Sequence, residues 1–222
     1  MIGLWRELFN DPKLPFLQVM LPELKKQQAK PGESLIAELR QAQINVAKAD
    51  EQVYVVNILD TQKKGNIHPT NKQLPGKRLA KLALAKVYEQ DIQYSSPEFS
   101  HLKIDDNKVL VSFKRVSSSL IVAKKKSSHS IELVKVNEPV LGFAVAGSDL
   151  KFYWADAKLE NNQLLLTSSQ VAAPKYVRYG WADNPGKLNL YDASGGPVMP
   201  FKTDNIAWQS KDNKEYKIVL VN

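Results

Sequence analysis

The residue of this sequence best suited to chemistry is His68. It follows an apolar run over 53–59 that ends at Asp60, and such a run is typical of a buried strand. An imidazole just beyond the carboxyl end of such a strand lies where open α/β sheets place their active sites. From that position it can take a proton from a nucleophile. A loop histidine that bonds its own backbone is the alternative interpretation.

Elements expected to position His68 alternate between helix and strand. The apolar spacing predicts strands over 14–21 and 53–59 and helices over 4–9, 35–43 and 77–88, with Ser34 as a helix cap. Both strands are almost continuously apolar, as in a parallel sheet that is covered on both faces. Sheets usually contain four or more strands. We therefore expect residues 1–94 to form part of an α/β domain, the rest of which lies outside this chain.

The pattern changes near residue 95, where short alternating runs replace helical periodicity. The expected strands are 108–113, 120–123, 142–146, 150–155, 163–167, 176–181 and 216–221. Turn residues separate them, and Gly147-Ser148-Asp149 is expected to be one such hairpin turn. Many short strands with regular turns predict an antiparallel β-sandwich over residues 95–222.

Three blocks of sequence carry a resemblance to a known family. They are Asn66 through Asn71-Lys72-Gln73 to Arg78-Leu79-Ala80, then Gly142 to Asp149, and then Val177 to Asp183, continued by Asn189-Leu190-Tyr191 and Pro200 to Asp204. These blocks resemble the sialate O-acetylesterase family, which are serine esterases of the SGNH (GDSL-like) hydrolase group. The resemblance runs, with gaps, over nearly the whole chain.

That resemblance implies a fold and an activity. Residues 1–94 would be the last part of a doubly wound, SGNH-hydrolase-like parallel sheet, followed by an accessory β-sandwich. The reaction would remove acetyl groups from sialic acid or another acetylated sugar, with His68 as general base to a serine. The competing hypothesis is a non-catalytic module in which the β-rich half binds glycans or has a structural role.

The sequence departs from the family pattern at the acid that orients the histidine. Many members carry an acid two residues before it, whereas this chain has Asn66, which offers no negative charge. Asp60 is the nearest replacement, although an aspartate there could equally cap the loop. No serine lies in a recognisable nucleophile block, and the oxyanion block is absent. We therefore expect the serine and the oxyanion donors to lie upstream, and the chain alone to be inactive.

Candidate substrate-binding residues lie in the third block. Arg178 and Trp181 could form a sugar-facing platform, because guanidinium groups and aromatic faces suit carboxylate and pyranose recognition. The alternative is that alternating residues of this strand divide between core and surface.

The composition limits which kinds of partner and cofactor are expected. The net charge is +8, but the densest cluster, Lys124-Lys125-Lys126, resembles a solvated hairpin tip, so no nucleic-acid partner is expected. The chain has no cysteine and three widely spaced histidines, which predicts neither metal nor cofactor. No apolar run approaches the ~20 residues of a membrane helix. The resemblance implies a periplasmic or secreted enzyme, but the first residues lack a secretory signal, so the compartment stays open.

Two macromolecular partners follow from the expected incomplete sheet. One is the missing amino-terminal half of the esterase domain. The other is a second copy of this chain, because the strand at 14–21 would present an unpaired apolar edge.

Overall fold

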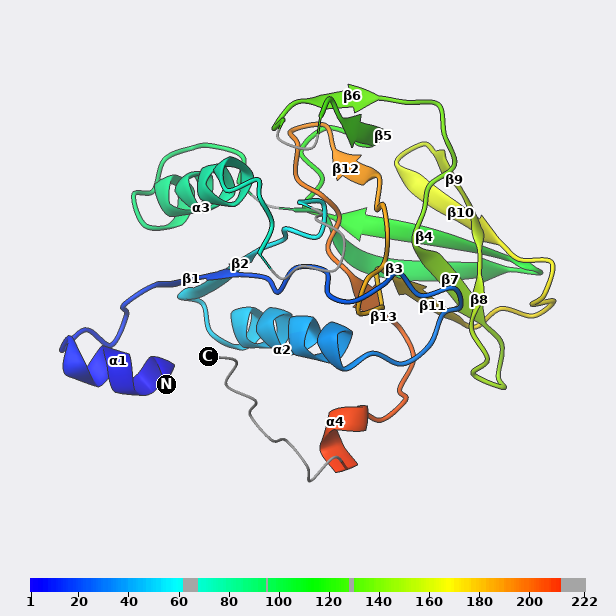
Figure 1. The fold of residues 1–222 in the computed structure, drawn as a ribbon, viewed down its shortest axis with the longest axis horizontal. Helices are drawn as coiled ribbons and strands as arrows, with labels where there is room; N and C mark the ends of the chain where they lie inside the picture. Colours follow the sequence, from blue (N-terminus) through cyan, green and yellow to red (C-terminus); the bar gives the residue numbers. More distant parts are fainter. Residues whose placement is uncertain (62–67, 95, 128–129, 213–222) are drawn as a thin grey trace.

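The structure, a computed structural model, describes residues 1–61, 68–94, 96–127 and 130–212 of the chain. A small α/β part formed by the first 94 residues lies beside a larger β-rich part (Figure 1). The strand predicted over 216–221 lies outside the described residues.

The α/β part is built on two parallel strands. β1 (Phe16–Val19) pairs with β2 (Val53–Val56) in the register Phe16 to Val53. Helix α2 (Leu35–Ala49) connects the strands, and α3 (Gln73–Lys86) follows β2; the two helices lie on either side of the strand pair (Figure 1). The predicted parallel pairing is confirmed. The described residues contain only these two strands in parallel, so they do not form a doubly wound sheet by themselves.

Element boundaries follow from local hydrogen bonds. Ser34 caps α2 as predicted, since its Oγ accepts the amide of Ala37 at 3.0 Å. β2 ends three residues earlier than expected, because the side chain of Asn57 accepts the amide of Leu59 at 2.9 Å and turns the chain. α3 begins at Gln73, before the predicted start, since Pro75 lies in the first turn, where its missing N–H removes no helical hydrogen bond.

The described residues of the β-rich part form three antiparallel sheets, which confirms the predicted antiparallel character. The first has the order β3 (Glu98–Asp105), β4 (Lys108–Lys114), β10 (Gln163–Thr167), β9 (Asp156–Glu160). The second has the order β13 (Phe201–Lys202), β11 (Tyr176–Tyr179), β7 (Phe143–Ala146), β8 (Tyr153–Trp154). The third has the order β12 (Leu190–Asp192), β5 (Leu120–Lys125), β6 (Leu133–Lys135). The turn at 147–149 joins β7 to β8, as expected.

The largest hydrophobic cluster spans both parts, and a smaller one, Val56, Ile58 and Leu82, lies within the α/β part. The inward faces of the first two sheets supply Val111, Leu164 and Phe143, as in packed sheets generally. Met20 after β1 and Leu59 after β2 belong to the same cluster. The chain therefore changes character near residue 95, but its core is continuous across that point.

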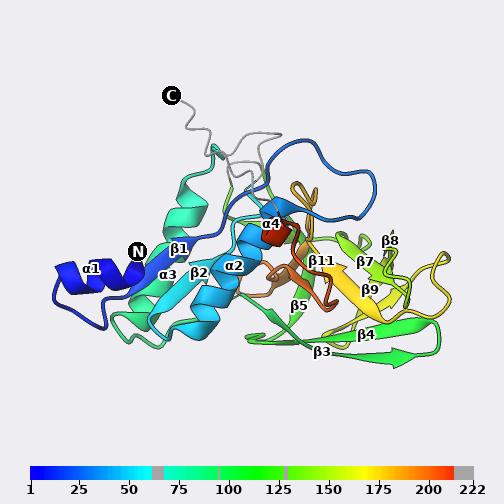
Figure 2. The same cartoon turned by 90° about the horizontal axis from the view of Figure 1, so that it is seen from below.

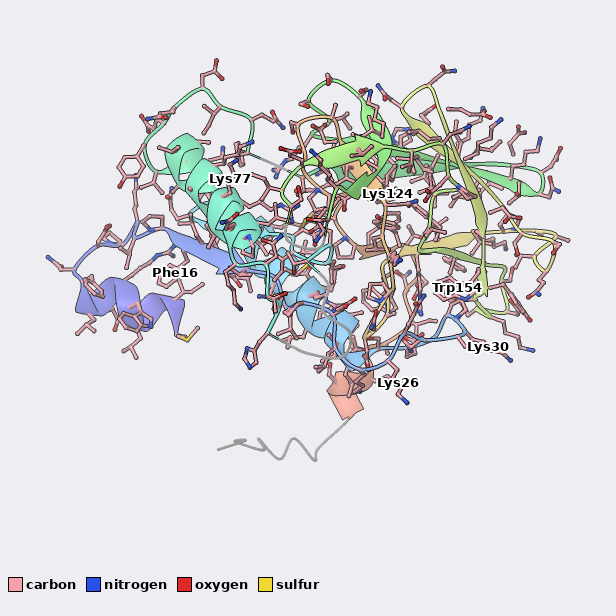
Figure 3. The ribbon with its side chains drawn as sticks, turned by 45° about the horizontal axis from the view of Figure 1, so that its top comes forward. Phe16, Lys26, Lys30, Lys77, Lys124 and Trp154 are labelled. Atoms are coloured by element: carbon pink, nitrogen blue, oxygen red, sulfur yellow. The ribbon has the colours of Figure 1, made fainter. Side chains whose placement is uncertain are left out.

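The loop between β1 and α2, residues 20–34, attaches the α/β part to the β-rich part. The indole Nε1 of Trp154 donates to the carbonyl of Ala29 at 2.9 Å, and the ammonium of Lys25 pairs with Asp183 at 2.7 Å. Figure 3 shows Trp154 beside the section of this loop that carries Lys30.

A buried guanidinium completes this junction. Arg40 of α2 is 1% exposed and donates to four carbonyl oxygens, those of Leu21, Pro22, Ala182 and Asp183, at 2.6 to 3.0 Å. Burial lowers the pKa of Arg40 to about 10, which still leaves it charged at neutral pH.

Helix α1 (Ile2–Leu8) has no buried residue and lies at the end of the molecule farthest from the β-rich part (Figures 1 and 2). Leu4, Leu8 and Phe9 are exposed, Leu8 at 74%. Arg6 attaches this helix to the end of α2, because its guanidinium binds both oxygens of Asp50 at 2.7 and 3.1 Å. At the other end of the described chain, α4 (Gln209–Asp212) donates the amides of its first two residues to the carboxylate of Glu38.

We expect Arg40→Met to destabilise the protein by roughly 3 kcal/mol or more, because it removes the donor of three carbonyls at the junction, those of Leu21, Pro22 and Ala182, while Asp183 keeps the amide of Leu24. Urea denaturation followed by tryptophan fluorescence measures the change. Gln41→Ala is the matched control on the same helix, since its amide makes only an exposed hydrogen bond to Asn45. A loss for Arg40→Met no larger than that of the control would contradict this role.

Candidate active-site region

His68 is exposed and lies on the segment that joins the carboxyl end of β2 to α3. This is the end of the strand pair at which the sequence places an active-site crevice. Asn66, the residue that replaces the family's usual acid, lies outside the described residues.

Asp60 lies at the start of the same segment and is buried. Its two carboxylate oxygens accept from the Nη1 and Nη2 atoms of Arg78, in α3, at 2.6 and 2.8 Å. The hydroxyl of Tyr191 lies 3.4 Å from the same carboxylate. Burial, followed by the charge of Asp60, raises the pKa of Tyr191, so this hydroxyl stays protonated and can donate. These contacts support the loop-holding interpretation of Asp60; an orienting contact to His68 stays a prediction.

The chain on the carboxyl side of His68 is also anchored. Pro69 and Asn71 are buried. The Oδ1 atom of Asn71 accepts the amide of Leu74 in the first turn of α3 at 3.1 Å, and its Nδ2 donates to the carbonyl of Ser130 at 3.3 Å. His68 is thus followed within three residues by two buried residues, and the side chain of one of them, Asn71, is held by hydrogen bonds.

Arg178 and Trp181 lie inside the protein, at 2% and 5% exposure. The guanidinium of Arg178 binds both oxygens of Asp204 at 2.7 and 3.0 Å and one oxygen of Glu33 at 2.7 Å. It also stacks over Phe152, 3.9 Å from the ring centroid. β11 is an inner strand of its sheet and the 20–34 loop covers Arg178, so these two side chains form an internal contact rather than a sugar-facing platform in this structure.

A cleft of about 860 Å³ lies along β2 between α2, α3 and loops of the β-rich part. Asn57 and Arg78 line it, which puts part of the cleft beside the buried carboxylate of Asp60. Its rim carries several lysines, Lys48, Lys77, Lys81 and Lys86.

Sequence reasoning missed the role of Arg78. It appeared only as part of the resemblance block, and no local pattern connects it with an aspartate 18 positions earlier. Within the described ranges, histidine and acidic side chains do not gather in groups of three or more that could hold a metal ion. No helix in the same ranges combines the length and apolar character that a bilayer crossing needs.

Comparisons with known proteins support an esterase relationship. No family model matches the chain, and no curated protein does. Among solved structures, the chain is similar to a carbohydrate acetylesterase from Xanthomonas citri, with a TM-score of 0.79 and 35% sequence identity. The match covers 92% of this chain and 44% of the other, so this chain spans less than half the length of that enzyme. The similarity supports a relationship to carbohydrate esterases, the broader class implied by the sequence resemblance.

The buried carboxylate of Asp204 makes stability depend on pH. Burial alone would raise the pKa of Asp204, but Arg178 and Lys202 hold it below its usual value. A lowered folded-state pKa contributes stability above the unfolded-state value of about 4, and this contribution disappears as the pH falls through the folded-state value.

We therefore expect the urea concentration at half-unfolding to decrease as the pH is lowered from 5 to 2. Asp204→Asn should be less stable than wild type at pH 7 and should lose less of its stability over the same interval. Equal slopes for the two proteins would show that Asp204 does not contribute to the acid sensitivity.

Proposed function

We propose that this chain supplies the histidine-bearing part of a carbohydrate O-acetylesterase, with His68 as the general base. The observation that carries the proposal is the similarity to the Xanthomonas citri carbohydrate acetylesterase over 92% of the chain at 35% identity. The exposure of His68 beyond the carboxyl end of β2 supports it, because a base must reach a nucleophile in solvent-accessible space.

The proposed reaction follows a serine mechanism, as in the SGNH hydrolases that the sequence resembles. His68 takes the proton of a serine hydroxyl while the serine oxygen attacks the acetyl carbonyl. The tetrahedral intermediate collapses with loss of the sugar oxygen, which receives the proton from the imidazolium. Water then attacks the acetyl-enzyme with His68 again as base, and acetate leaves. The proposed substrate is an acetylated sugar of the sialate type.

In this proposal, the serine and oxyanion donors come from a region equivalent to the part of the Xanthomonas enzyme that the chain does not match. Two surfaces suit such a partner. β1 has a neighbour on one edge only within the described strands, and Val19 on it is exposed. Helix α1 presents Leu4 and Leu8 to solvent, and its C-cap residue Phe9 is also exposed. Further parallel strands on β1 would cover these apolar groups and complete a doubly wound sheet.

The activity test combines this chain with the complementary region. We expect the isolated chain to hydrolyse p-nitrophenyl acetate and O-acetylated sialic acid little or not at all. Activity should appear when the chain is co-expressed with the unmatched region of the Xanthomonas citri enzyme. His68→Gln should abolish that activity.

His101→Gln is the matched control, since His101 is exposed on β3 and makes only a contact to Ser100. Full activity in the isolated chain would contradict the shared site, and an active His68→Gln variant would contradict the base. Comparison of acetylated sialic acid with acetylated xylose tests the sugar preference.

The exposed apolar surface of α1 and β1 predicts association of the isolated chain. We expect dimers or larger particles by light scattering, since an unpaired apolar strand edge pairs readily with another chain. A Leu4→Glu/Leu8→Glu double variant should shift the chain toward monomer, because it places charges on the exposed helix. Leu141→Glu, an exposed leucine in the β-rich part, is the control. A monodisperse wild-type monomer would contradict this prediction.

A further inference from the structure

The segment that carries His68 leaves β2 at Asn57 and enters α3 at Gln73, and one side chain of α3 holds its beginning. Arg78 Nη1 donates to the carbonyl of Asn57 at 2.7 Å and to Oδ1 of Asp60 at 2.6 Å. Arg78 Nη2 donates to Oδ2 of Asp60 at 2.8 Å. The fork of the guanidinium therefore fixes the orientation of the strand end relative to the helix that follows the histidine.

This pair is shielded from solvent. The Arg78 side chain is 13% exposed and the Asp60 side chain 2%. Screening by water and salt is weak at such a site, so the pair is sensitive to its geometry. A lysine at position 78 would keep the charge but would lose the planar fork.

The β-rich part supports the same end of the segment. Asn57 Nδ2 donates to the carbonyl of Val198 at 2.9 Å, and both groups are buried. Two longer contacts add to this support. The hydroxyl of Tyr191 donates to Asp60 at 3.4 Å, and Nδ2 of Asn71 donates to the carbonyl of Ser130 at 3.3 Å. Residues on both sides of His68 are thus attached to the β-rich part, mainly through Asn57.

We propose that Arg78 is a positioning residue for His68, acting through Asp60 and the backbone of Asn57. This rests on the proposed function of His68 as a base. A general base must lie within about 3 Å of the proton it accepts. A displacement of about 1 Å can cost about a hundredfold in rate. In this arrangement the β-rich half is part of the support of the active site and does not serve only to bind glycans.

The first test uses the isolated chain and does not depend on catalysis. Arg78→Lys keeps the charge, and the double variant Asp60→Asn/Arg78→Met removes both charges so that no buried ion is left unpaired. We expect ¹⁵N relaxation and hydrogen exchange to show greater motion at the amides of His68 and Thr70 in both variants. The ring signals of His68, assigned with His68→Gln, should shift.

Arg6→Lys is the matched control. It alters a guanidinium pair of the same geometry, with Asp50, in α1 at the other end of the α/β part. The signals of His68 should not change in this variant.

The second test uses the co-expressed, active assembly. We expect Arg78→Lys to lower kcat by about 10- to 100-fold, with KM within about twofold of wild type, because the base is displaced while the sugar still binds. Unchanged relaxation and unchanged kcat would overturn the proposal. So would a loss of kcat that follows only from a lower folded fraction, measured by circular dichroism. If His68 responds as expected in the isolated chain but wild type shows no esterase activity, the positioning role holds and the proposed function fails.

Discussion

The arrangement of the two parts depends on how backbone carbonyls are satisfied where the α/β part meets the β-rich part. The chain after β1 and the chain after β11 both present carbonyl oxygens at this junction, and Arg40 donates to two from each side. A guanidinium has five donors in one plane and no acceptor, so a single side chain can serve several carbonyls that helices and strands leave unpaired. Loss of such a buried donor is costly, because the carbonyls around it are left unsatisfied in a place that water does not reach.

Arg178 and Arg78 repeat this solution with carboxylates. Arg178 attaches the 20–34 loop to β11 through Glu33 and Asp204, while Arg78 attaches α3 to the end of β2 through Asp60. Each of the three guanidinium groups joins segments that are far apart in the sequence. Together they determine where the carboxyl ends of β1 and β2 lie, and the candidate site is at those ends.

The sequence was sufficient to predict the helices and strands that depend on contacts between residues close together in the chain. Apolar periodicity located both parallel strands and the three larger helices, and Ser34 was recognised as a cap because its role depends on a residue three positions away. The boundaries of β2 and α3 were less accurate, as was the end of α2, which continues to Ala49 instead of ending near residue 43. Asn57 ends β2 through a turn that apolar spacing does not show, and α3 begins at Gln73 with Pro75 in its first turn, four residues before the predicted start.

Long-range pairing could not be read in the same way. Asp60 was singled out for its place after a strand, but its partner Arg78 lies in the next helix, and the contact depends on the path of the chain between them. Arg178 and Trp181 were singled out for their chemistry. Arg178 is covered by the 20–34 loop, whose Gly32 and Glu33 lie 146 and 145 positions away in the sequence. Residue type marked these groups as candidates for a functional role, and only the fold shows which contacts they make.

The position of the core bears on how this fold can work as an esterase. A catalytic domain with an independent accessory module would share no core with it. Here the α/β part has a small cluster of its own at Val56, Ile58 and Leu82, but Met20, Ile44 and Leu59 pack in the same cluster as the β-rich sheets. The end of β2 is therefore fixed by packing on the β-rich part as well as by its pairing with β1. In the proposed assembly, a region that completes the sheet at β1 would meet a histidine whose position is already determined from the opposite side. Under the proposed positioning role of Arg78, the precision of that position would be a property of the whole chain, because Asn57 binds both Arg78 of α3 and the carbonyl of Val198.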